Sequence, residues 1–269
     1  MKVVTAIQAR TSSTRLPGKV LLPLCEETLL FRMIERVRGS KLAGTIIVAT
    51  SITPEDDPIE QLCLEKNILC FRGDLNDLLD RHYKLAQHYN AEAVVKIPSD
   101  CPLIDPAIID RVIGYFLQNE SSYDFVSNLH PASYPDGNDV EIMTFKALEY
   151  AWLYATRGFE REHTTPYIWE NRNIFRIGNV ALPNSVNYFM THRWTIDYEE
   201  DYYFIREVFE HLFPKNPQFT FMDIMDLIET HPEIATLNKQ YYGRYWYENH
   251  LNELNTIRDF KLKKEPYEA

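Results

Sequence analysis

The residues best suited to chemistry lie directly after the first apolar run of the chain. Residues 8–19 read QARTSSTRLPGK and combine four hydroxyl side chains with Arg10, Arg15 and Lys19. In a loop after a buried strand, backbone N–H groups can bind anionic oxygens, and arginine can hold a phosphate through two hydrogen bonds. The segment lacks the G-x-x-x-x-G-K-[ST] and G-x-G-x-x-G patterns of other phosphate-binding loops. We therefore expect a phosphate-binding loop of a different kind; the alternative is a solvated basic loop.

Two aspartates form the second candidate group. Asp100 follows the apolar run AVVKI and lies between Pro98 and Pro102, which stiffen its loop. Asp197 follows a strand-like run and precedes a helical pattern. Mg²⁺ prefers oxygen ligands and usually shares substrate phosphates, so the two carboxylates together could form a magnesium site. Each could instead cap a local structure, and for Asp197 the pattern favours neither interpretation.

The elements around these residues alternate between strands and helices. Such alternation is typical of βαβ units and a mostly parallel, twisted sheet, in which ligands bind beyond the carboxyl ends of the strands. The basic loop and the Asp100 loop both follow predicted strands, so we expect them to meet in one crevice. The predicted strands of this half are 2–8, 45–50, 68–71 and 93–97, and the helices are 29–38, 77–88 and 105–117.

The second half changes character after a turn signal at 134–138. The patterns predict strands at 139–143, 174–177 and 185–195, and helices at 145–155, 161–170 and 199–212. We predict one mixed α/β domain over residues 1–235, with a small inserted α+β subdomain at about 120–195. Residues 236–269 form an aromatic, charged extension, which either packs on the body or contacts a second subunit of a homodimer.

Composition narrows the classes of partner. The chain of 269 residues has a net charge of −11, which argues against general binding to nucleic acid or to an anionic membrane. Its four cysteines are scattered without a C-x-x-C spacing, as in reduced thiols of a cytosolic protein. The first apolar run is too short for a signal peptide, and no run is long enough to span a bilayer. We therefore expect a cytoplasmic protein.

The segment IQARTSSTRLPGK resembles the N-terminal nucleotide-binding motif of the CMP-sugar synthetases, the cytidylyltransferases that act on Kdo and sialic acids. Within that superfamily the chain is most similar to the spore-coat polysaccharide biosynthesis protein F type. Further motifs follow in the family's order over roughly residues 1–210. They are RGDLNDLLDRH (72–82), PSDCPLID (98–105), YPDGNDVEI (134–142), REHTTPY (161–167) and RWTIDYEEDYYF (193–204).

The resemblance implies a GT-A-like nucleotidyltransferase fold and transfer of CMP from CTP to a sugar acid, with Mg²⁺ as cofactor and pyrophosphate as the second product. It implies catalytic roles for Arg10, Lys19 and Asp100, and a metal site at Asp100 and Asp197. It places the acceptor near Glu141, His163 and Arg193. The nucleotide-binding residues that it implies are Ala9, Arg10, Ser12, Ser13, Arg15, Lys19, Arg72, Asp80, Arg81 and Ser99.

Two other functions stay open at this point. A GT-A glycosyltransferase would use the same fold with a nucleotide-sugar donor, but such enzymes commonly bind their metal through D-x-D, which this sequence lacks. A catalytically silent subunit would bind nucleotide without releasing pyrophosphate. His163 is the attractive general base, although a helical histidine beside acidic residues is more often structural.

Overall fold

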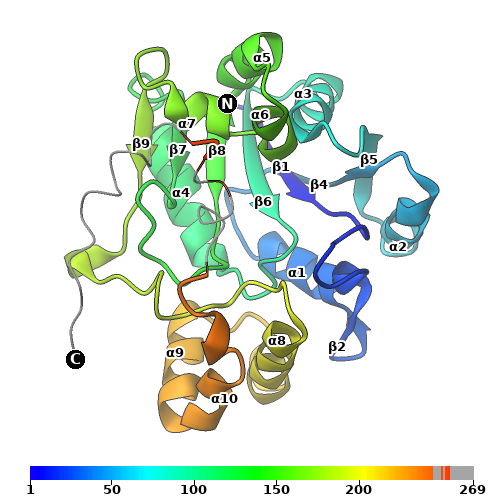
Figure 1. Ribbon diagram of the computed structural model, residues 1–269, viewed down its shortest axis with the longest axis vertical. Helices are drawn as coiled ribbons and strands as arrows, with labels where there is room; N and C mark the ends of the chain where they lie inside the picture. The colour runs from blue at the N-terminus through cyan, green and yellow to red at the C-terminus, as the bar shows by residue number, and fades with distance from the viewer. Residues whose placement is uncertain (245–249, 251, 255–269) are drawn as a thin grey trace.

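A seven-stranded sheet forms the centre of the computed structural model, which describes residues 1–244, 250 and 252–254 (Figure 1). The strand order is β5-β4-β1-β6-β8-β7-β9, and the four strands β5, β4, β1 and β6 are parallel. The predicted α/β fold is therefore confirmed. The strands are β1 Val3–Gln8, β4 Thr45–Ser51, β5 Leu69–Gly73, β6 Ala93–Pro98, β7 Phe125–Ser127, β8 Glu141–Thr144 and β9 Ile177–Asn179, with a small hairpin of β2 Pro23–Leu24 and β3 Glu27–Thr28.

Local capping defines where the helices begin. Asp105 accepts a hydrogen bond from the Ala107 N–H, and Pro106 occupies the first helical position of α4, as the sequence predicts. Asp77 caps α3 in the same way. The helices are α1 Leu29–Arg38, α2 Asp57–Glu65, α3 Leu78–His88, α4 Pro106–Gln118, α5 Phe145–Tyr154, α6 Gly158–His163, α7 Pro166–Glu170, α8 Glu199–Leu212, α9 Phe221–Thr230 and α10 Pro232–Thr236.

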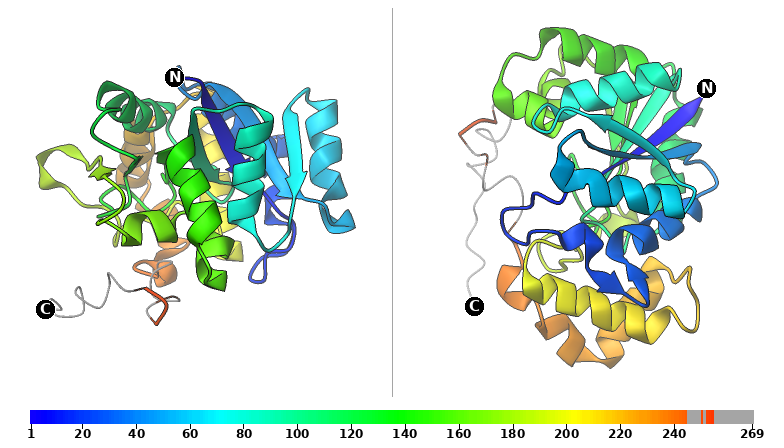
Figure 2. Two further views of the ribbon diagram at one scale, coloured as in Figure 1. Left: turned by 90° about the horizontal axis from the view of Figure 1, so that it is seen from above. Right: turned by 90° about the vertical axis from the view of Figure 1, so that its right-hand side faces the viewer.

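Helices cover both faces of the sheet and also its lower end. Alternate residues of β1 point to opposite faces, so that Ile7 packs with α1, α2 and α4 whereas Val4 packs with the layer of α3, α5 and α7. Helices α8, α9 and α10 form a third apolar cluster around Trp194, and they make the separate layer at the bottom of Figure 2, right. No helix in the described part of the chain is long and apolar enough to cross a membrane.

Two sequence predictions in the second half are wrong. The helix predicted over 161–170 is two short helices, α6 and α7, because Thr164 has a left-handed φ of 71° and Pro166 lacks the N–H that would continue the first helix. The strand predicted over 185–195 is irregular apart from a single bridge between Asp136 and Arg193. Its backbone instead follows turns, with Tyr188 donating to the Ser133 carbonyl.

The remaining predicted strands of this half are displaced. Strand β9 begins where the predicted 174–177 strand ends, and β8 lies one to two residues after the predicted 139–143. Strands β7, β8 and β9 all join the main sheet. Part of the aromatic, charged extension predicted at 236–269 lies outside the described residues.

Candidate active site

The basic loop is held in shape from within and from α2. Gly18 adopts a left-handed φ of 70° and donates to the Thr11 carbonyl, which closes the loop just before Lys19. The Thr11 N–H and hydroxyl both donate to Asp56, at 2.7 and 2.8 Å. Burial opposes ionisation of Asp56, but hydrogen bonds from Ser51 and Thr11 lower its pKa below the usual value. A carboxylate at the start of α2 therefore anchors the loop.

Lys19 joins the two predicted metal-binding aspartates. Its ammonium lies 3.5 Å from Asp100 and 3.1 Å from Asp197, and it also donates to the Ile196 carbonyl. The Asp100 backbone meets the same segment, since its carbonyl accepts from the Thr195 hydroxyl and the Ile196 N–H. The structure therefore brings the first loop, the Asp100 loop and the Asp197 segment together at the carboxyl ends of β1 and β6.

Arg15, Lys19, Arg193, Asp100 and Asp197 contact one another and form what we call the ionic cluster. The side chain of Asp197 belongs to this cluster and does not cap α8. Its Oδ1 contacts Arg15 at 2.6 Å as well as Lys19. Asp201 provides the cap instead, because it accepts from the backbone N–H groups of Asp197 and Tyr198. Burial would raise the pKa of Asp197, but Lys19 and Arg15 together hold it below the usual value. The contacts thus exclude the capping role that the sequence left open for Asp197, and its role as a metal ligand stays a prediction.

Arg193 organises the cluster from the inside. Its side chain is 4% exposed, and its five N–H groups donate to Asp201 twice, to Asp197, to Asp136 and to the Arg244 carbonyl. The resemblance placed Arg193 near the acceptor. In this structure all five N–H groups of Arg193 already donate to other residues, so its contacts indicate that it positions Asp197.

Sequence reasoning missed several members of this network. Asn238 donates to the Arg193 carbonyl and to Asp201, and both distances are 2.9 Å. Asp136 is in the segment that the sequence analysis treated as a turn, and its carboxylate receives Arg193 at 3.2 Å. For Asp136, the signal available in the sequence was the pair of aspartates, Asp136 and Asp139, that follow Pro135. Asn238 lies in the C-terminal extension and offered none.

The turn at 136–139 places two more carboxylates close to Asp100. Burial first, and then Asp139, raises the pKa of Asp136 well above its usual value. Burial, followed by Asp100 and Glu141, raises the pKa of Asp139 to about 7. Gly137 makes this approach feasible: its φ is 110°, and a Cβ there would come within 2.5 Å of the Trp194 carbonyl carbon.

Glu141 lies in a buried polar group beside the cluster. Opposite it on β6, Lys96 donates to one carboxylate oxygen, and the Thr165 hydroxyl donates to the other at 2.7 Å. His130 lies 4.0 Å away. Burial opposes ionisation, but Lys96 and His130 lower the pKa of Glu141 to about 2. Glu141 is therefore a charged, hydrogen-bonded residue at the position expected to face an acceptor.

His163 ends α6 and faces the C-terminal segment. Its ring lies 4.7 Å from the ring of His250 and 5.1 Å from that of Phe159. Burial first, and then His250, lowers the pKa of His163 to about 3. A general base works best with a pKa near the operating pH, so this environment does not favour His163 as a base.

The other residues predicted near the nucleotide either lie where the two loops meet or belong to the basic loop itself. Ala9 is the first residue after β1, and Ser99 donates its N–H to the Gln8 carbonyl, so both lie at the junction of the two loops. Ser13 accepts from the Leu16 N–H within the loop, whereas Ser12 is exposed. Arg10 points toward α6, where its guanidinium lies 4.0 Å from Glu162.

Three predicted nucleotide contacts in the 72–82 segment have partners elsewhere. Arg72 pairs with Asp57 and Glu60 of α2 at 2.6 Å each. Asp80 accepts from the Trp152 indole and pairs with Lys84, which places it against α5. Arg81 is buried and donates to the carbonyls of Asp74 and Leu75; burial lowers its pKa to about 10. The structure does not bring Arg72 and Asp80 to the ionic cluster.

The donor chemistry of the cluster fits Mg²⁺ only in part. Asp100 and Asp197 supply carboxylate oxygens on either side of one cation, the Lys19 ammonium. Among the described residues, no group of three or more acidic, histidine or cysteine side chains could hold a metal ion by itself. A magnesium ion held here would therefore take its other oxygens from substrate phosphate and water, as this ion usually does.

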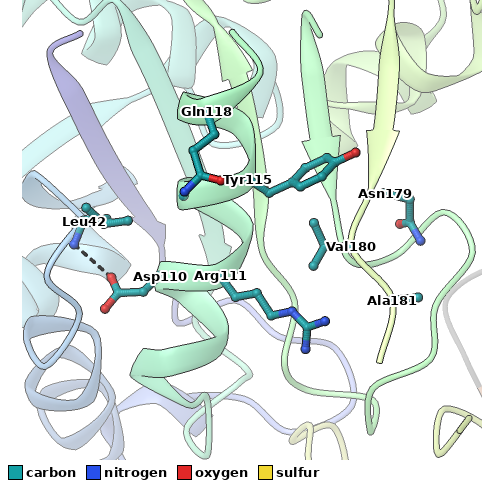
Figure 3. A pocket seen from close by; sticks show the side chains of 9 residues that line it. Leu42, Asp110, Arg111, Tyr115, Gln118, Asn179, Val180 and Ala181 are labelled. Carbon is teal, nitrogen blue, oxygen red and sulfur yellow. Dashed lines mark hydrogen bonds between the residues drawn. The ribbon is translucent and has the colours of Figure 1, made fainter. Parts of the chain in front are cut away.

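A separate hollow of about 530 Å³ lies beside α4 (Figure 3). Arg111 and Tyr115 of α4 point across it toward residues 179–181, and Asp110 at its edge accepts from the Leu42 N–H at 2.9 Å. None of the residues predicted for the site lines this hollow. The predicted metal-binding and catalytic residues Lys19, Asp100 and Asp197 therefore lie in the ionic cluster and not at this hollow.

Comparison with known proteins agrees with this architecture. A cytidylyltransferase of Leptospira borgpetersenii is 35% identical, and the alignment covers 87% of this chain and 97% of that one with a TM-score of 0.82. The spore coat polysaccharide biosynthesis protein SpsF of Bacillus subtilis is 29% identical over 87% of this chain and 97% of its own length. The structure of a CMP:2-keto-3-deoxy-manno-octonic acid synthetase complexed with CTP shares the fold, with a TM-score of 0.59 at 16% identity over 78% of this chain and 99% of that one. The family model described as cytidylyltransferase matches residues 4–256, so the chain belongs to the cytidylyltransferase family and is a nucleotidyltransferase that uses CTP, as the resemblance predicted.

Proposed function

We propose that this enzyme transfers CMP from CTP to a hydroxyl group of a sugar acid, for the synthesis of a surface or spore-coat polysaccharide. The observation that carries the proposal is the position of Lys19 between Asp100 and Asp197, at the carboxyl ends of β1 and β6. Ligands of open α/β sheets bind at this edge. The similarity to SpsF supports the polysaccharide context.

Each residue of the cluster has a distinct task in this proposal. Arg10, Arg15 and Lys19 bind the triphosphate, and Lys19 neutralises the charge that develops on the departing pyrophosphate. Asp100 and Asp197 would hold Mg²⁺, which when bound polarises the phosphoryl oxygens. Arg193 fixes the orientation of Asp197. The attacking hydroxyl belongs to the acceptor, so no protein nucleophile is required, and positioning supplies much of the catalysis.

The acceptor lies on the side of Glu141 and His163. Glu141 is held ionised by Lys96, and its buried carboxylate holds Lys96 and Thr165 in place beside the acceptor. A cytoplasmic location and a homodimer complete the proposal.

A two-stage experiment tests this function. First, thermal stabilisation by CTP, UTP, ATP and GTP is measured with and without Mg²⁺; we expect the largest shift with CTP, increased by Mg²⁺. Second, pyrophosphate release is measured from CTP with Kdo, with nonulosonic acids and with neutral sugars as acceptors. Release only with the acids supports the proposal. Stabilisation by UDP- or GDP-sugars alone would indicate a glycosyltransferase, and binding without turnover on any acceptor would indicate a silent subunit.

A further inference from the structure

The two aspartates of the proposed metal site are already neutralised by the cations that are assigned to the triphosphate. Asp197 Oδ1 contacts Arg15 at 2.6 Å and Lys19 at 3.1 Å, and Asp100 contacts Lys19 at 3.5 Å. Two cations thus face two carboxylates. A divalent ion approaching this arrangement meets the repulsion of both cations and finds Oδ1 of Asp197 engaged.

We propose that Arg15 and Lys19 exchange partners when a nucleoside triphosphate binds: they leave Asp197 and Asp100 for the phosphates, and only then do the two carboxylates become available to a divalent cation. This inference rests on the proposed function, because it takes Asp100 and Asp197 as the metal ligands. It makes metal affinity a consequence of nucleotide binding.

The exposures of the partners show which contact is able to exchange. The Arg15 side chain is 45% exposed and reaches Asp197 from solvent, whereas the Arg193 side chain on the other oxygen is 4% exposed and bound by four groups. Arg15 also lies 5.8 Å from the centre of the Tyr198 ring, a second contact besides its hydrogen bond to Asp197. Arg193 therefore keeps Oδ2 and the orientation of Asp197 fixed while Oδ1 changes partner.

The number of ligands supports the same order of events. Within residues 1–244, 250 and 252–254, no cluster of three or more metal-binding side chains exists. Mg²⁺ requires near-octahedral oxygen coordination, which two aspartates cannot complete. The triphosphate therefore acts twice: it draws two cations away from the carboxylates, and it adds oxygens of its own.

Thermodynamic linkage makes the proposal measurable from either side. If nucleotide increases the affinity for metal by some factor, metal increases the affinity for nucleotide by the same factor. Removal of the Arg15 charge takes away one of the two cations on Asp197 Oδ1 without nucleotide, so the metal should then bind more tightly to the protein alone. The coupling between the two ligands should decrease at the same time.

The test measures Mn²⁺ binding to the full chain without nucleotide, from the electron paramagnetic resonance signal of free Mn²⁺. Wild type is compared with Arg15→Gln and with the control Arg176→Gln, which removes a similarly exposed arginine from Asp124 far from the cluster. We expect Arg15→Gln to bind Mn²⁺ about tenfold more tightly and Arg176→Gln to match wild type. Adding Asp197→Asn to Arg15→Gln should abolish the gain. In metal-free buffer, Arg15→Gln should bind CTP more weakly.

The outcomes separate this inference from the proposed function. Equal Mn²⁺ affinity in wild type and Arg15→Gln, with loss of binding in Asp100→Asn, would overturn the exchange and leave the metal site standing. Weaker Mn²⁺ binding in Arg15→Gln would also overturn it. Unchanged Mn²⁺ binding and unchanged pyrophosphate release in Asp100→Asn would overturn the metal assignment of the proposed function itself, and the exchange with it.

Discussion

The basic loop and the 72–82 segment carry similar cations but use them differently. In the loop, Arg15 and Lys19 contact the carboxylates of Asp197 and Asp100. In the 72–82 segment, Arg81 donates to the carbonyls of residues 74 and 75, and Arg72 donates to the carbonyls of residues 51 and 53 as well as to surface carboxylates. A phosphate group can compete for a cation paired with a carboxylate. Arg81 has only main-chain carbonyls as hydrogen-bond partners, and these would lose their donor if it moved, so Arg81 is structural. Lys19 also donates to the Ile196 carbonyl, but it has two carboxylate partners besides.

The partner of a cation therefore distinguishes a binding role from a structural role, whereas its presence in a motif does not. Both segments resemble family motifs, and from sequence both were expected to contact the nucleotide. Substitutions in the two segments should consequently act on different quantities: turnover for the loop and its carboxylates, stability for the 72–82 segment.

The largest effect is expected on the carboxylate side of the cluster. Asp100→Asn removes a charge that faces Lys19 and the proposed metal, and we expect Mg²⁺-dependent turnover to fall by at least about 10³-fold with the fold intact. Pyrophosphate release measures the turnover, and circular dichroism checks the fold. Normal turnover would show that Asp100 has no part in the chemistry.

Lys19→Ala should follow, with a loss on the order of 10²–10³ in kcat, because one cation is removed from the leaving pyrophosphate. Single-turnover measurement with saturating CTP separates this loss from weaker binding. Lys19→Arg is the matched variant, and partial recovery there would sharpen the assignment to charge. A kcat of Lys19→Ala equal to that of wild type would contradict the binding role that the comparison gives to the basic loop.

Arg81→Met tests the structural side. It preserves much of the side-chain volume but leaves the carbonyls of residues 74 and 75 without their donor, at a cost of about 1–3 kcal/mol in the free energy of unfolding. Urea denaturation measures the loss, and kcat of the folded protein should stay near that of wild type. A large fall in kcat at unchanged stability would return Arg81 to the nucleotide site.

Asp139→Asn tests the excess of carboxylates beside Asp100. Because burial raises the pKa of Asp139 to about 7, the folded state binds this proton more tightly than the unfolded chain, so ionisation destabilises the fold. The penalty is absent below about pH 4 and complete above about pH 7. The variant should be more stable at pH 8 by about 1 kcal/mol, roughly 2–4 °C in Tm, and the difference should vanish toward pH 4. A pH-independent difference would contradict the pKa.

Arg72→Ala should have the smallest effect. Its pairs with Asp57 and Glu60 involve carboxylates that are 60% and 41% exposed, and such surface pairs contribute about 0–1 kcal/mol each. Arg72 also donates to the carbonyls of residues 51 and 53, but its side chain is 20% exposed, so water can replace it there, unlike at the buried Arg81. Denaturation in low and high salt should show a small loss that salt reduces further. A CTP affinity lower than that of wild type by more than about tenfold would place Arg72 in the nucleotide site after all.

Most of the parallel half could be predicted from sequence because each signal there is local. Buried β-branched runs mark the strands, and Asp105-Pro106 marks the start of α4. The meeting of the basic loop with Asp100 followed from one rule about strand ends. The 185–195 segment was mistaken for a strand because its apolar residues alternate, although its hydrogen bonds go to a distant turn.

The remainder of the site depends on contacts that no local pattern encodes. Arg193 reaches Asp136 and Asp201, and Asn238 joins them from the C-terminal extension. From sequence, Asp197 could be a helix cap or a metal ligand, and only the position of Asp201 excludes the cap. Residue spacing alone does not show which side chains contact each other when they lie far apart in the sequence.

The bond between Lys19 and the Asp197 segment also has a consequence for synthesis of the protein. Lys19 is 177 residues from Ile196 and 178 residues from Asp197 in the chain, and contacts between residues so far apart in sequence are slow to form. On the ribosome, the basic loop emerges long before its acidic partners and remains without them until residue 197 has left the exit tunnel. A chain interrupted before residue 197 therefore carries the first family motif but no assembled ionic cluster.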